Sequence, residues 1–596
     1  MSTNISKQKR DALLNKINQI KNFISAAPQD ENTANLLTYI GELTKEINGK
    51  KYGLVFEEHR EKIDELLEEN APVLVEQEDL FIDNGGEMNF LIEGDNLAAL
   101  KLLEKTHKGK IDVIYIDPPY NTGNKDFIYD DDYVDEEDSF RHSKWISFMK
   151  NRLFLAKDLL KEDGILFVSI DDNEQSSLKT FCDSLFQFVS VLPTVMNLKG
   201  NQDEYGFAGT HEYTLVYVKN KSKAVFGEFP LDEEEIESDW IEDEIGFYKK
   251  GATLKRTGND APREKRPYGY YPILINNSDM SVCSITEEEY KKIYNNEKKE
   301  FNDTYVNELK QKYENENFSF ILPQADGVKT SWRWQFKKTV REKNEIIVTK
   351  GMDGFSLYKK QRPELLDIPS KKPKSLLYKP QYSSGNGTSQ LKDILLEKKF
   401  NNPKPIELIQ DFLLISTKKN STILDFFAGS GTTGHAVMKL NAKDGGNRKF
   451  ILCTNNENNI CQDVTYQRLK TVITGKRKDG SDYDENYKAS LKYFKIDYLP
   501  IKDKMYYEYA DELLEHVKEL VELENAIDFN TNKSVAIVLD DDELAEFAEN
   551  IADYPECKTL YMGHDVLTSY QQEQTIKAHG ITINTIPDYY YRDLAN

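Results

Sequence analysis

Cysteine is scarce in this chain, and its spacing excludes two common structural devices. Five cysteines occur among 596 residues, and the closest pair, Cys453 and Cys461, is too far apart for the C-x₂₋₄-C spacing of a zinc knuckle. The spacings do not suggest a disulfide framework either, which fits a reducing compartment. We therefore expect a cytoplasmic protein without a metal site.

Long apolar runs are missing as well. No segment approaches the ~18 consecutive apolar residues of a membrane-spanning helix, and Met1 to Arg10 lacks the apolar core of a secretory signal. No G-x-x-x-x-G-K-[ST] loop occurs, so the chain should not hydrolyse ATP, and no internal repeat is visible. A hydrophobic content of 39% in 596 residues predicts a folded protein of several domains.

The most informative stretch runs from Ile111 to Tyr120. Its first six residues are mostly β-branched or aromatic, which predicts a buried parallel strand. Two consecutive prolines then remove N–H groups that a sheet ladder needs, so the chain must leave the sheet there. Asp117 is thereby placed at the carboxyl end of a strand, where open α/β sheets bind their ligands.

This D-P-P-Y turn carries the groups needed to hold a planar ring with an exocyclic amino group. Tyr120 could stack on the ring, while the carboxylate of Asp117 and the carbonyl of Pro118 accept the two N–H bonds. Pro119 would keep the turn stiff and extended. An ordinary strand exit, whose acid only caps a turn, would have the same residues. A second motif far downstream favours the functional interpretation.

The second motif is Gly429-x-Gly431-x-x-Gly434, which follows a predicted strand and opens a predicted helix, as a nucleotide-binding loop does. On this motif alone an NAD-dependent dehydrogenase is the leading alternative, with Glu457 placed to take ribose hydroxyls. The residues around the glycines instead suit a nucleoside with a zwitterionic amino-acid tail. These residues are Asp425 and Phe427 before the glycines and Thr432 and Thr433 after them.

Strands and helices alternate on both sides of a long interruption, which predicts an α/β fold with a mostly parallel, doubly wound sheet. A glycine- and serine-rich run at 383–387 predicts a mobile loop near the end of the interruption. The expected division is an N-terminal helical region at 1–80, the first half of the sheet domain at 81–220, an inserted domain at 221–398, the second half at 399–500 and a small C-terminal α/β module at 501–596.

The net charge of −24 argues, taken whole, against nucleic-acid binding, but basic residues are concentrated in the interruption. Seven basic residues and two acidic ones lie between Gly246 and Pro272, and the segment from Lys329 to Lys379 interleaves basic residues with aromatics. Such segments suit a surface that tracks phosphates and stacks bases, although a solvated face has a similar composition. The residues expected to contact nucleic acid are Lys255, Arg256, Arg263, Lys265, Arg266, Trp332, Arg333 and Trp334.

Together, Asp117-Pro118-Pro119-Tyr120 and Phe427-Ala428-Gly429-Ser430-Gly431 resemble motifs IV and I of the amino-methyltransferases that act on DNA. Their order, with an insert between them, resembles the β class of that family. The resemblance implies a Rossmann-like methyltransferase fold with a target-recognition domain at 221–398. It also implies that the D-P-P-Y turn holds the target amino group and that the glycine loop binds S-adenosylmethionine.

Shorter matches extend the resemblance over nearly the whole chain. Glu93–Leu97 looks like motif III, in which the acid, here Asp95, contacts the adenine of the cofactor. Asn402–Pro405 resembles motif X, and Glu457 has the position of motif II, although either of the two asparagines before it could bind the ribose instead. The likeness is closer still to the Mod subunits of type III restriction–modification systems. It implies double-stranded DNA as substrate, a restriction (Res) subunit as partner, and a homodimer.

The implied reaction is site-specific methylation of the N6 amino group of adenine, with Asp117 as an anionic acceptor and the target base flipped out of the duplex. Three other functions stay open: an N4-cytosine methyltransferase, a solitary methyltransferase without a restriction partner, and an NAD-dependent dehydrogenase. In the related cytosine enzymes a serine commonly replaces the acid of D-P-P-Y. A non-catalytic DNA-binding protein would be expected to have lost Asp117 or the glycines.

Overall fold

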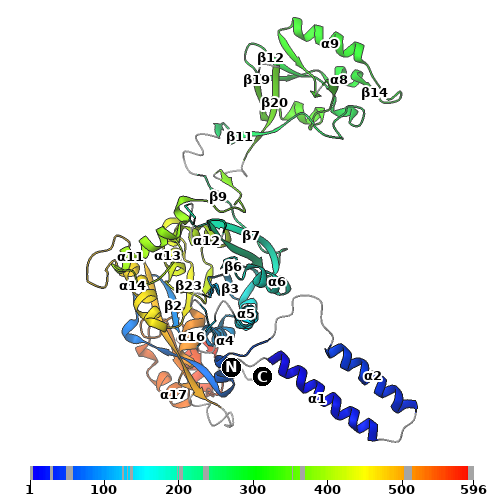
Figure 1. Ribbon diagram of the computed structural model, residues 1–596. Helices are drawn as coiled ribbons and strands as arrows, with labels where there is room; N and C mark the ends of the chain where they lie inside the picture. The colour runs from blue at the N-terminus through cyan, green and yellow to red at the C-terminus, as the bar shows by residue number, and fades with distance from the viewer. Residues whose placement is uncertain are drawn as a thin grey trace. The chain divides into compact units, whose positions relative to one another are not determined.

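The computed structural model describes residues 5–26, 31–48, 58–123, 127–129, 132–134, 138–197, 199–200, 206–231, 240–325, 327–351, 354–362, 369–501 and 513–587. The chain forms two compact units. The first combines Met1–Gly227 with Lys374–Asn596, and the second is the insert Glu228–Pro373 (Figure 1). In the described residues, no helix combines the length and apolar character that a bilayer crossing requires.

A nine-stranded sheet forms the centre of the first unit. Its central strands run parallel from β24 to β6, and antiparallel strands complete both edges. In sheet order the strands are β1 (Asn70–Glu76), β24 (Ala489–Pro500), β2 (Glu87–Glu93), β23 (Lys449–Thr454), β22 (Thr422–Asp425), β3 (Ile111–Ile116), β6 (Leu160–Ile170), β8 (His211–Val218) and β7 (Gln187–Val195).

Helices cover both faces of this sheet (Figure 1). Strand β3 shows why, because Ile114 and Ile116 belong to one hydrophobic core whereas Val113 and Tyr115 belong to the other. Successive side chains of a strand point to opposite faces, so an uninterrupted apolar strand requires cover on both. One face is covered by α4 (Asn96–His107), α5 (Arg141–Leu159), α6 (Gln175–Leu185) and α16 (Val517–Asn525), and the other by α11 (Ser384–Leu395), α12 (Ile406–Ser416), α13 (Thr432–Asp444) and α14 (Gln467–Thr474). The predicted doubly wound α/β fold is confirmed.

The N-terminal region departs from the prediction. It contains the helices α1 (Ile5–Ala26), α2 (Glu31–Asn48) and α3 (Lys62–Glu69), but the next residues form β1 of the large sheet. A purely helical region over residues 1–80 is therefore wrong. Strand β1 pairs antiparallel with β24, so two segments from distant parts of the chain form this edge together.

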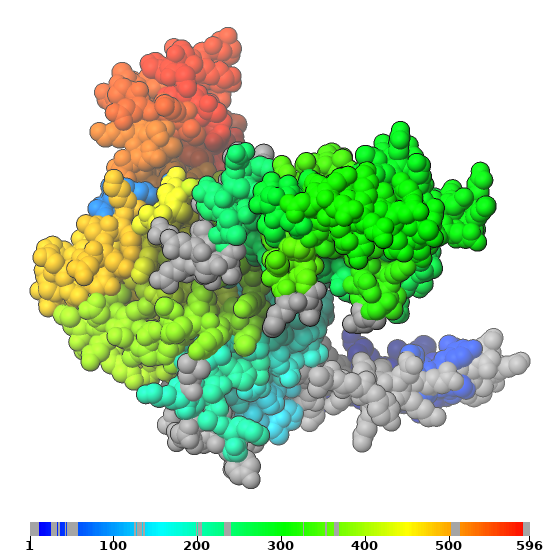
Figure 2. All heavy atoms as spheres, turned by 90° about the horizontal axis from the view of Figure 1, so that it is seen from above, coloured from blue at the N-terminus to red at the C-terminus, as the bar shows by residue number. Residues whose placement is uncertain are grey.

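The insert is a mixed α/β unit with a core of its own. It gathers into one mass of atoms, green in the space-filling view (Figure 2). Its main strands are β10 (Ile241–Asp243), β11 (Gly246–Thr253), β20 (Gly354–Gln361) and β19 (Ile346–Gly351) in one sheet and β13 (Val282–Ser284), β12 (Ile273–Asn276) and β16 (Phe318–Ile321) in another. Short pairs are formed by β14 (Tyr294–Asn295) with β15 (Glu300–Phe301), β17 (Gln324–Ala325) with β18 (Val328–Lys329), and β9 (Phe229–Pro230) with β21 (Ser370–Lys371). Within its described residues, the α-helices are α8 (Glu287–Ile293), α9 (Asp303–Asn315) and α10 (Phe336–Arg341).

The compact insert is shorter than the predicted 221–398. Residues 374–398 belong to the first unit, and the predicted mobile loop at 383–387 is wrong, because α11 begins at Ser384. The close packing around position 387 explains why a glycine occurs in this helix. A Cβ on it would lie 2.1 Å from the carbonyl oxygen of Pro403, so this glycine allows close packing of the helix.

The C-terminal module has three parallel strands, β25 (Val535–Val538), β26 (Thr559–Met562) and β27 (Thr582–Thr585), with helices α17 (Asp541–Glu549) and α18 (Tyr570–Ala578). These strands match the three expected from the sequence. The charged helix expected from Tyr506 begins in residues outside the described part. Its described portion, α16, is packed into a core of the large sheet domain, so the predicted boundary at 501 does not separate two cores.

Candidate active site

Four acidic residues follow four neighbouring parallel strands. Asp425 ends β22 and Asp117 comes directly after β3, while Asp95 and Glu457 lie shortly beyond β2 and β23. The order β2-β23-β22-β3 brings these strand ends to one edge of the sheet. Chain connections diverge between β22 and β3, which is the topological switch point where open α/β sheets bind ligands.

The glycine loop after β22 is held in shape by the protein around it. Gly429 and Gly431 both have left-handed backbones, with φ of 49° and 75°. A Cβ on Gly429 would lie 3.2 Å from Cζ of Phe400, and one on Gly431 would lie 3.2 Å from Cγ2 of Thr465. The hydroxyl of Thr465 also donates to the carbonyl of Gly429 at 2.5 Å. Both positions therefore favour glycine for conformation as well as for space.

Asp425, Thr432 and Thr433 are buried and bonded within the protein. The carboxylate of Asp425 accepts from the N–H of Phe427 at 3.0 Å and from the hydroxyl of Thr433 at 2.5 Å. Burial raises the pKa of Asp425 to about 7 against the opposing effect of these two donors. The hydroxyl of Thr432 donates to the carbonyl of Lys404 at 3.2 Å. These side chains stabilise the loop from inside.

Phe427 and Asp95 are more accessible. The ring of Phe427 is half-buried, with its centroid 5.8 Å from that of Phe148. Asp95 caps α4 by accepting from the N–H of Leu97 at 2.7 Å, and its other oxygen lies 3.5 Å from the guanidinium of Arg152. The side chain of Asp95 is 34% exposed, so it remains accessible to a ligand at this edge of the sheet.

Glu457 lies on the surface, in a single 3₁₀ turn (Glu457–Asn459) that follows β23. The turn includes Asn458 and Asn459 with φ of 52° and 59°, and a π-helical segment, Ile460–Tyr466, comes next. Left-handed asparagines and π-helical turns are frequent at functional sites. The neighbouring Asn456 accepts from the N–H of Gln462 at 3.2 Å.

The D-P-P-Y turn is anchored from α5. The indole N–H of Trp145 donates to the carbonyl of Pro119 at 2.7 Å. Directly after the turn, Asn121 adopts φ of 58° and its amide donates to Oε1 of the buried Glu174 at 2.6 Å. Nδ1 of His142 lies 2.7 Å from the same oxygen. Burial raises the pKa of Glu174, against the effect of its two partners. These contacts fix the backbone that carries the turn.

Asp117 and Tyr120 belong to a four-membered polar network. The hydroxyl of Tyr120 lies 3.0 Å from Oδ1 of Asp117 and 3.2 Å from Oε2 of Glu212, on β8. The ammonium of Lys404 donates to that hydroxyl at 2.8 Å and lies 3.0 Å from Oδ2 of Asp117 and 3.4 Å from Oε1 of Glu212. Lys404 and Glu212 thus contact the predicted catalytic residues Asp117 and Tyr120 directly.

Sequence reasoning did not place these two partners beside Asp117, although Lys404 lies within the N-P-K-P match. A lysine between two prolines next to an apolar helix was the available signal, since a buried lysine requires an acidic partner. Which acid it would meet depends on strands from other parts of the chain. Arg152 was missed for the same reason; it is fully buried and pairs with Glu61 at 2.7 Å.

The two insert segments expected to bind nucleic acid lie side by side. The N–H of Arg256 donates to the carbonyl of Ser331 at 2.9 Å, and the N–H of Arg333 donates to that of Leu254 at 2.7 Å. Lys265, Arg266 and Arg333 are exposed, and Lys255, Arg256 and Trp334 are half-buried. The predicted basic and aromatic residues of this set therefore share one region of the insert.

Two residues of that prediction are structural instead. Trp332 is 3% exposed within the core of the insert and donates from Nε1 to the carbonyl of Tyr271 at 2.7 Å, so the expected stacking on bases is wrong for this residue. Arg263 forms two hydrogen bonds to Asp303, at 2.6 and 2.8 Å, and its guanidinium lies 4.2 Å from the ring centroid of Phe301. This side chain is committed to holding the insert together.

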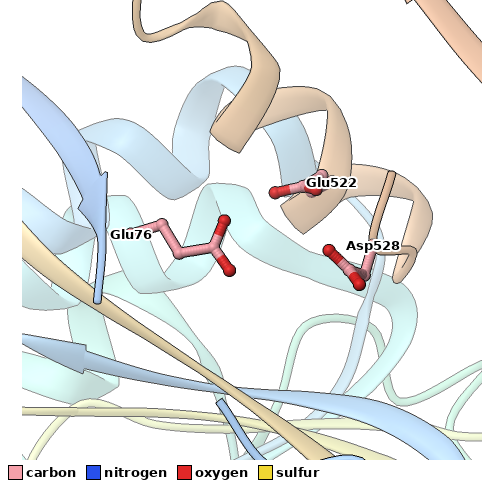
Figure 3. A group of neighbouring side chains, drawn as sticks. All are labelled: Glu76, Glu522 and Asp528. Atoms are coloured by element: carbon pink, nitrogen blue, oxygen red, sulfur yellow. The ribbon is translucent and has the colours of Figure 1, made fainter. Parts of the chain in front are cut away.

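Within the described residues, one group of carboxylates lies close enough together to suit a metal ion. It consists of Glu76, Glu522 and Asp528, which turn toward a shared space (Figure 3). The ammonium of the buried Lys492 lies 3.1, 2.6 and 2.8 Å from the three carboxylates, respectively. A cation is therefore already present among these acids. The cluster joins β1, β24 and the α16 region.

The fold and this edge define a Rossmann-like α/β protein with a glycine loop beside a carboxylate turn at its switch point. A scan against models of protein families matches residues 111–465 to the N6_N4_Mtase family, described as DNA methylase. This match covers more than half of the chain, and the chain belongs to the DNA methylase family. The predicted resemblance to methyltransferases that act on DNA is confirmed at the level of the family.

Similar proteins include both type III and type II enzymes. The type III EcoPI Mod subunit of Escherichia phage P1 is 43% identical over 401 residues, which are 63% of this chain and 58% of that protein. The type II methyltransferase M.KpnI of Klebsiella pneumoniae is 30% identical over 410 residues, 68% of this chain and 89% of that protein. The chain spans less than two thirds of the type III relative.

Solved structures that match include the M1.HpyAVI–SAM complex, with 14% identity and a TM-score of 0.27 over 64% of this chain and 98% of that one. The cytosine-N4-specific PvuII DNA methyltransferase matches with 12% identity and a TM-score of 0.23, over 63% of this chain and 86% of that one. Scores this low carry no weight for fold or function. The fold class rests on the strand order.

Proposed function

We propose that this protein transfers a methyl group from S-adenosylmethionine to the N6 amino group of adenine at specific sites in double-stranded DNA. The observation that carries the proposal is the adjacency of two strand ends: β22 leads into the glycine loop and β3 into the D-P-P-Y turn. A loop for a nucleoside cofactor and a turn for an amino group thus lie side by side. Membership of the DNA methylase family supports the same chemistry.

The residues at this edge fit S-adenosylmethionine. Gly431 caps α13 without a side chain, so the first N–H groups of the helix suit the carboxylate of the amino-acid tail. Asp95 and Glu457 offer carboxylates to the adenine and ribose, and Phe427 offers an aromatic ring beside them. We assign Asp425, Thr432 and Thr433 to shaping the loop. When bound, the cofactor supplies an electrophilic methyl group.

The catalytic residues prepare the amine. Its lone pair is delocalised into the adenine ring, and hydrogen bonds from both N–H groups favour a pyramidal nitrogen with a localised pair. Asp117 and the carbonyl of Pro118 accept those bonds, and a hydrogen bond to a carboxylate contributes about 1.5–3 kcal/mol. Asp117 then takes the proton that leaves the methylated nitrogen. Tyr120 stacks on the flipped base, which has lost its neighbours in the duplex.

Recognition of the DNA sequence is assigned to the insert. Lys255, Arg256, Lys265, Arg266 and Arg333 would contact phosphates and bases, because they are basic, adjacent and either exposed or only half-buried. Trp334 offers a half-buried ring in the same region. The acidic balance of the whole chain does not oppose this role, because local potential governs the encounter with DNA.

We further propose that the chain is the modification and recognition subunit of a type III restriction–modification system, acting in the cytoplasm with a Res subunit. The 43% identity to a type III Mod subunit supports this. A homodimer is proposed as well. Its support is the row of large apolar side chains exposed on α1 and α2, namely Leu13, Ile20, Phe23, Leu36 and Leu43. Light scattering after size exclusion would test it.

Long-read sequencing of DNA from cells that express only this chain tests the reaction. Methylation of adenine N6 at one recurring sequence is expected. Modified cytosine would favour the N4-cytosine alternative, and tight binding of a nicotinamide dinucleotide in place of S-adenosylmethionine would favour a dehydrogenase. A pull-down that finds no restriction subunit in the native host would favour a solitary methyltransferase.

A further inference from the structure

Lys404 connects the two halves of the site. Its carbonyl accepts from the hydroxyl of Thr432, at the start of the helix that follows the glycine loop, and its ammonium lies 3.0 Å from Oδ2 of Asp117. Only 9% of the residue is exposed. Pro403 and Pro405 flank it and restrict the backbone. One rigid residue therefore touches both the loop proposed for the cofactor and the carboxylate proposed for the target amine.

The ammonium of Lys404 forms ion pairs with two carboxylates, those of Asp117 and Glu212. Burial lowers the pKa of Lys404, but Asp117 and Glu212 outweigh burial and raise it, so the lysine stays charged. Burial raises the pKa of Glu212, and the charge of Asp117 raises it as well. Lys404 has the opposite effect and lowers this pKa. Tyr115 and Asp425 are the other titratable groups that interact with Asp117 here. Without Lys404, two acids would face each other in a buried site with no counterion.

The hydroxyl of Tyr120 has one proton and two acceptors. It lies 3.0 Å from Oδ1 of Asp117 and 3.2 Å from Oε2 of Glu212, and it accepts from Lys404 at 2.8 Å. Burial, followed by the two carboxylates, raises its pKa well above the usual value, so it stays a hydroxyl. While it donates to Asp117, it competes with an incoming amine. Donation to Glu212 instead leaves Oδ1 of Asp117 open.

We propose that Lys404 is a positioning residue that orients the carboxylate of Asp117, and that the hydroxyl of Tyr120 shifts its hydrogen bond from Asp117 to Glu212 when the target amine binds. Lys404 then retains Oδ2, and the amine takes Oδ1. This inference rests on the proposed methyl transfer. It assigns a purpose to Glu212, which otherwise would be a half-buried acid beside another acid.

The first test replaces the charge. Single-turnover methyl transfer is measured between pH 5.5 and 9 for wild type, Lys404→Met and Lys404→Arg. Lys404→Met should lower the rate at pH 6.5 by roughly 100-fold and move the acidic limb of the profile up by about one pH unit or more, because the paired carboxylates take up a proton more readily. Lys404→Arg retains the positive charge, so its acidic limb should fall at nearly the same pH as in wild type. Lys398→Met, at an exposed lysine of the same segment, is the matched control.

Two readouts separate positioning from packing. Calorimetric titration of S-adenosylmethionine should give affinities within about threefold of wild type for Lys404→Met, since its side chain faces the carboxylates. Adding Glu212→Gln to Lys404→Met should move the acidic limb back toward wild type, because it removes one of the two charges. Ethylammonium chloride should restore part of the lost rate in Lys404→Ala, whose shortened side chain leaves room for the added cation. An acidic limb that does not move in Lys404→Met would overturn the role of Lys404, whatever the rate.

The hydroxyl shift has its own test, which also serves if Lys404→Met does not fold. Glu212→Met removes one acceptor, so Tyr120 stays on Asp117 and transfer should slow by about 10-fold. Tyr120→Phe in that background should restore part of the lost rate, because the hydroxyl that competes for Oδ1 of Asp117 is gone. Fully additive losses would overturn the shift. If wild type itself transfers no methyl group to DNA, the proposed function fails; wild-type activity with unaltered variants refutes this inference alone.

Discussion

Val113 of β3 and Ile423 of β22 lie opposite each other in the sheet, although the entire insert separates them in the sequence. The two strands pair in parallel, and the carboxylate of Asp112 accepts from the N–H of Thr422 at 2.8 Å where the pairing begins. At the other end, this pairing brings the D-P-P-Y turn and the glycine loop to one edge.

Asp117→Ala should reduce methyl transfer at least about 100-fold, because it removes the acceptor for the target amine and for its proton. Affinity for S-adenosylmethionine should stay within a few-fold of wild type. Asp117 follows β3, whereas the glycine loop proposed for the cofactor follows β22. Methyl incorporation and calorimetric titration measure the two effects. Glu162→Ala, an exposed acid at the opposite end of β6, is the control. Near-normal turnover of Asp117→Ala would remove this residue from catalysis.

Gly431→Asp should abolish binding of S-adenosylmethionine. The new side chain would crowd Thr465, strain a backbone with φ of 75° and place a negative charge at the start of α13. Gly445→Asp is a close control, because Gly445 ends the same helix with φ of 66° and has nothing near a Cβ. Calorimetry that finds unchanged affinity in a folded Gly431→Asp variant would exclude this loop from the cofactor site.

DNA binding should depend strongly on salt despite the net charge of −24. Each lost phosphate contact lowers the slope of log K against log salt by about one. Replacing Lys255, Arg256, Lys265 and Arg266 together by alanine should therefore reduce the slope by up to about four units. Fluorescence anisotropy at several salt concentrations measures it.

The control for that variant removes the same charge elsewhere in the insert. Alanine at four exposed lysines, Lys291, Lys298, Lys299 and Lys310, should leave the slope almost unchanged. Equal slopes for both variants would mean that the basic segment is only a solvated face. Circular dichroism confirms that each variant is folded.

Arg263→Ala should destabilise the insert by about 2 kcal/mol rather than act on DNA contacts alone. The change removes both hydrogen bonds to Asp303 and the guanidinium beside Phe301 and Tyr270. Hydrogen exchange of the full chain should show faster opening around these residues. Arg333→Ala, at an exposed arginine of the same unit, should not change exchange in that core.

Asp425 should make the protein less stable as the pH rises from about 4 to 7. Its folded pKa is raised to about 7, so the folded state holds a proton that the unfolded state has already lost in this range. The free energy of unfolding then falls by up to about 1.4 kcal/mol per pH unit from this group. Asp425→Asn should lose this dependence. Thermal melting of both proteins at pH 5 and 7.5 measures it; parallel pH dependences would contradict the assignment.

Local patterns in the sequence predicted the central strands well. The apolar run before Asp117 and the prolines after it determine where β3 ends, because these effects act between neighbouring residues. The glycines determine the loop after β22 in the same way. The strand order was not contained in these patterns, since pairing of β3 with β22 depends on contacts across the insert.

Buried charges account for much of what the sequence did not show. Strand β24 was not predicted, and its residue Lys492 is completely buried among Glu76, Glu522 and Asp528. A lysine in a strand predicts exposure unless its partners are known. Trp332 shows the converse, because an aromatic in a basic segment predicted a surface ring but packs in the core.

By itself, the sequence determined the class of fold, the D-P-P-Y turn, the glycine loop and the family resemblance, because local composition and short spacings encode all four. Only the tertiary structure decided that Lys404 and Glu212 form a polar network with Asp117, the proposed catalytic acid. The physical reason is that a buried charge is stable only beside its counter-charge. Here the partners come from three separate strand and helix ends, and only folding brings them within hydrogen-bonding distance.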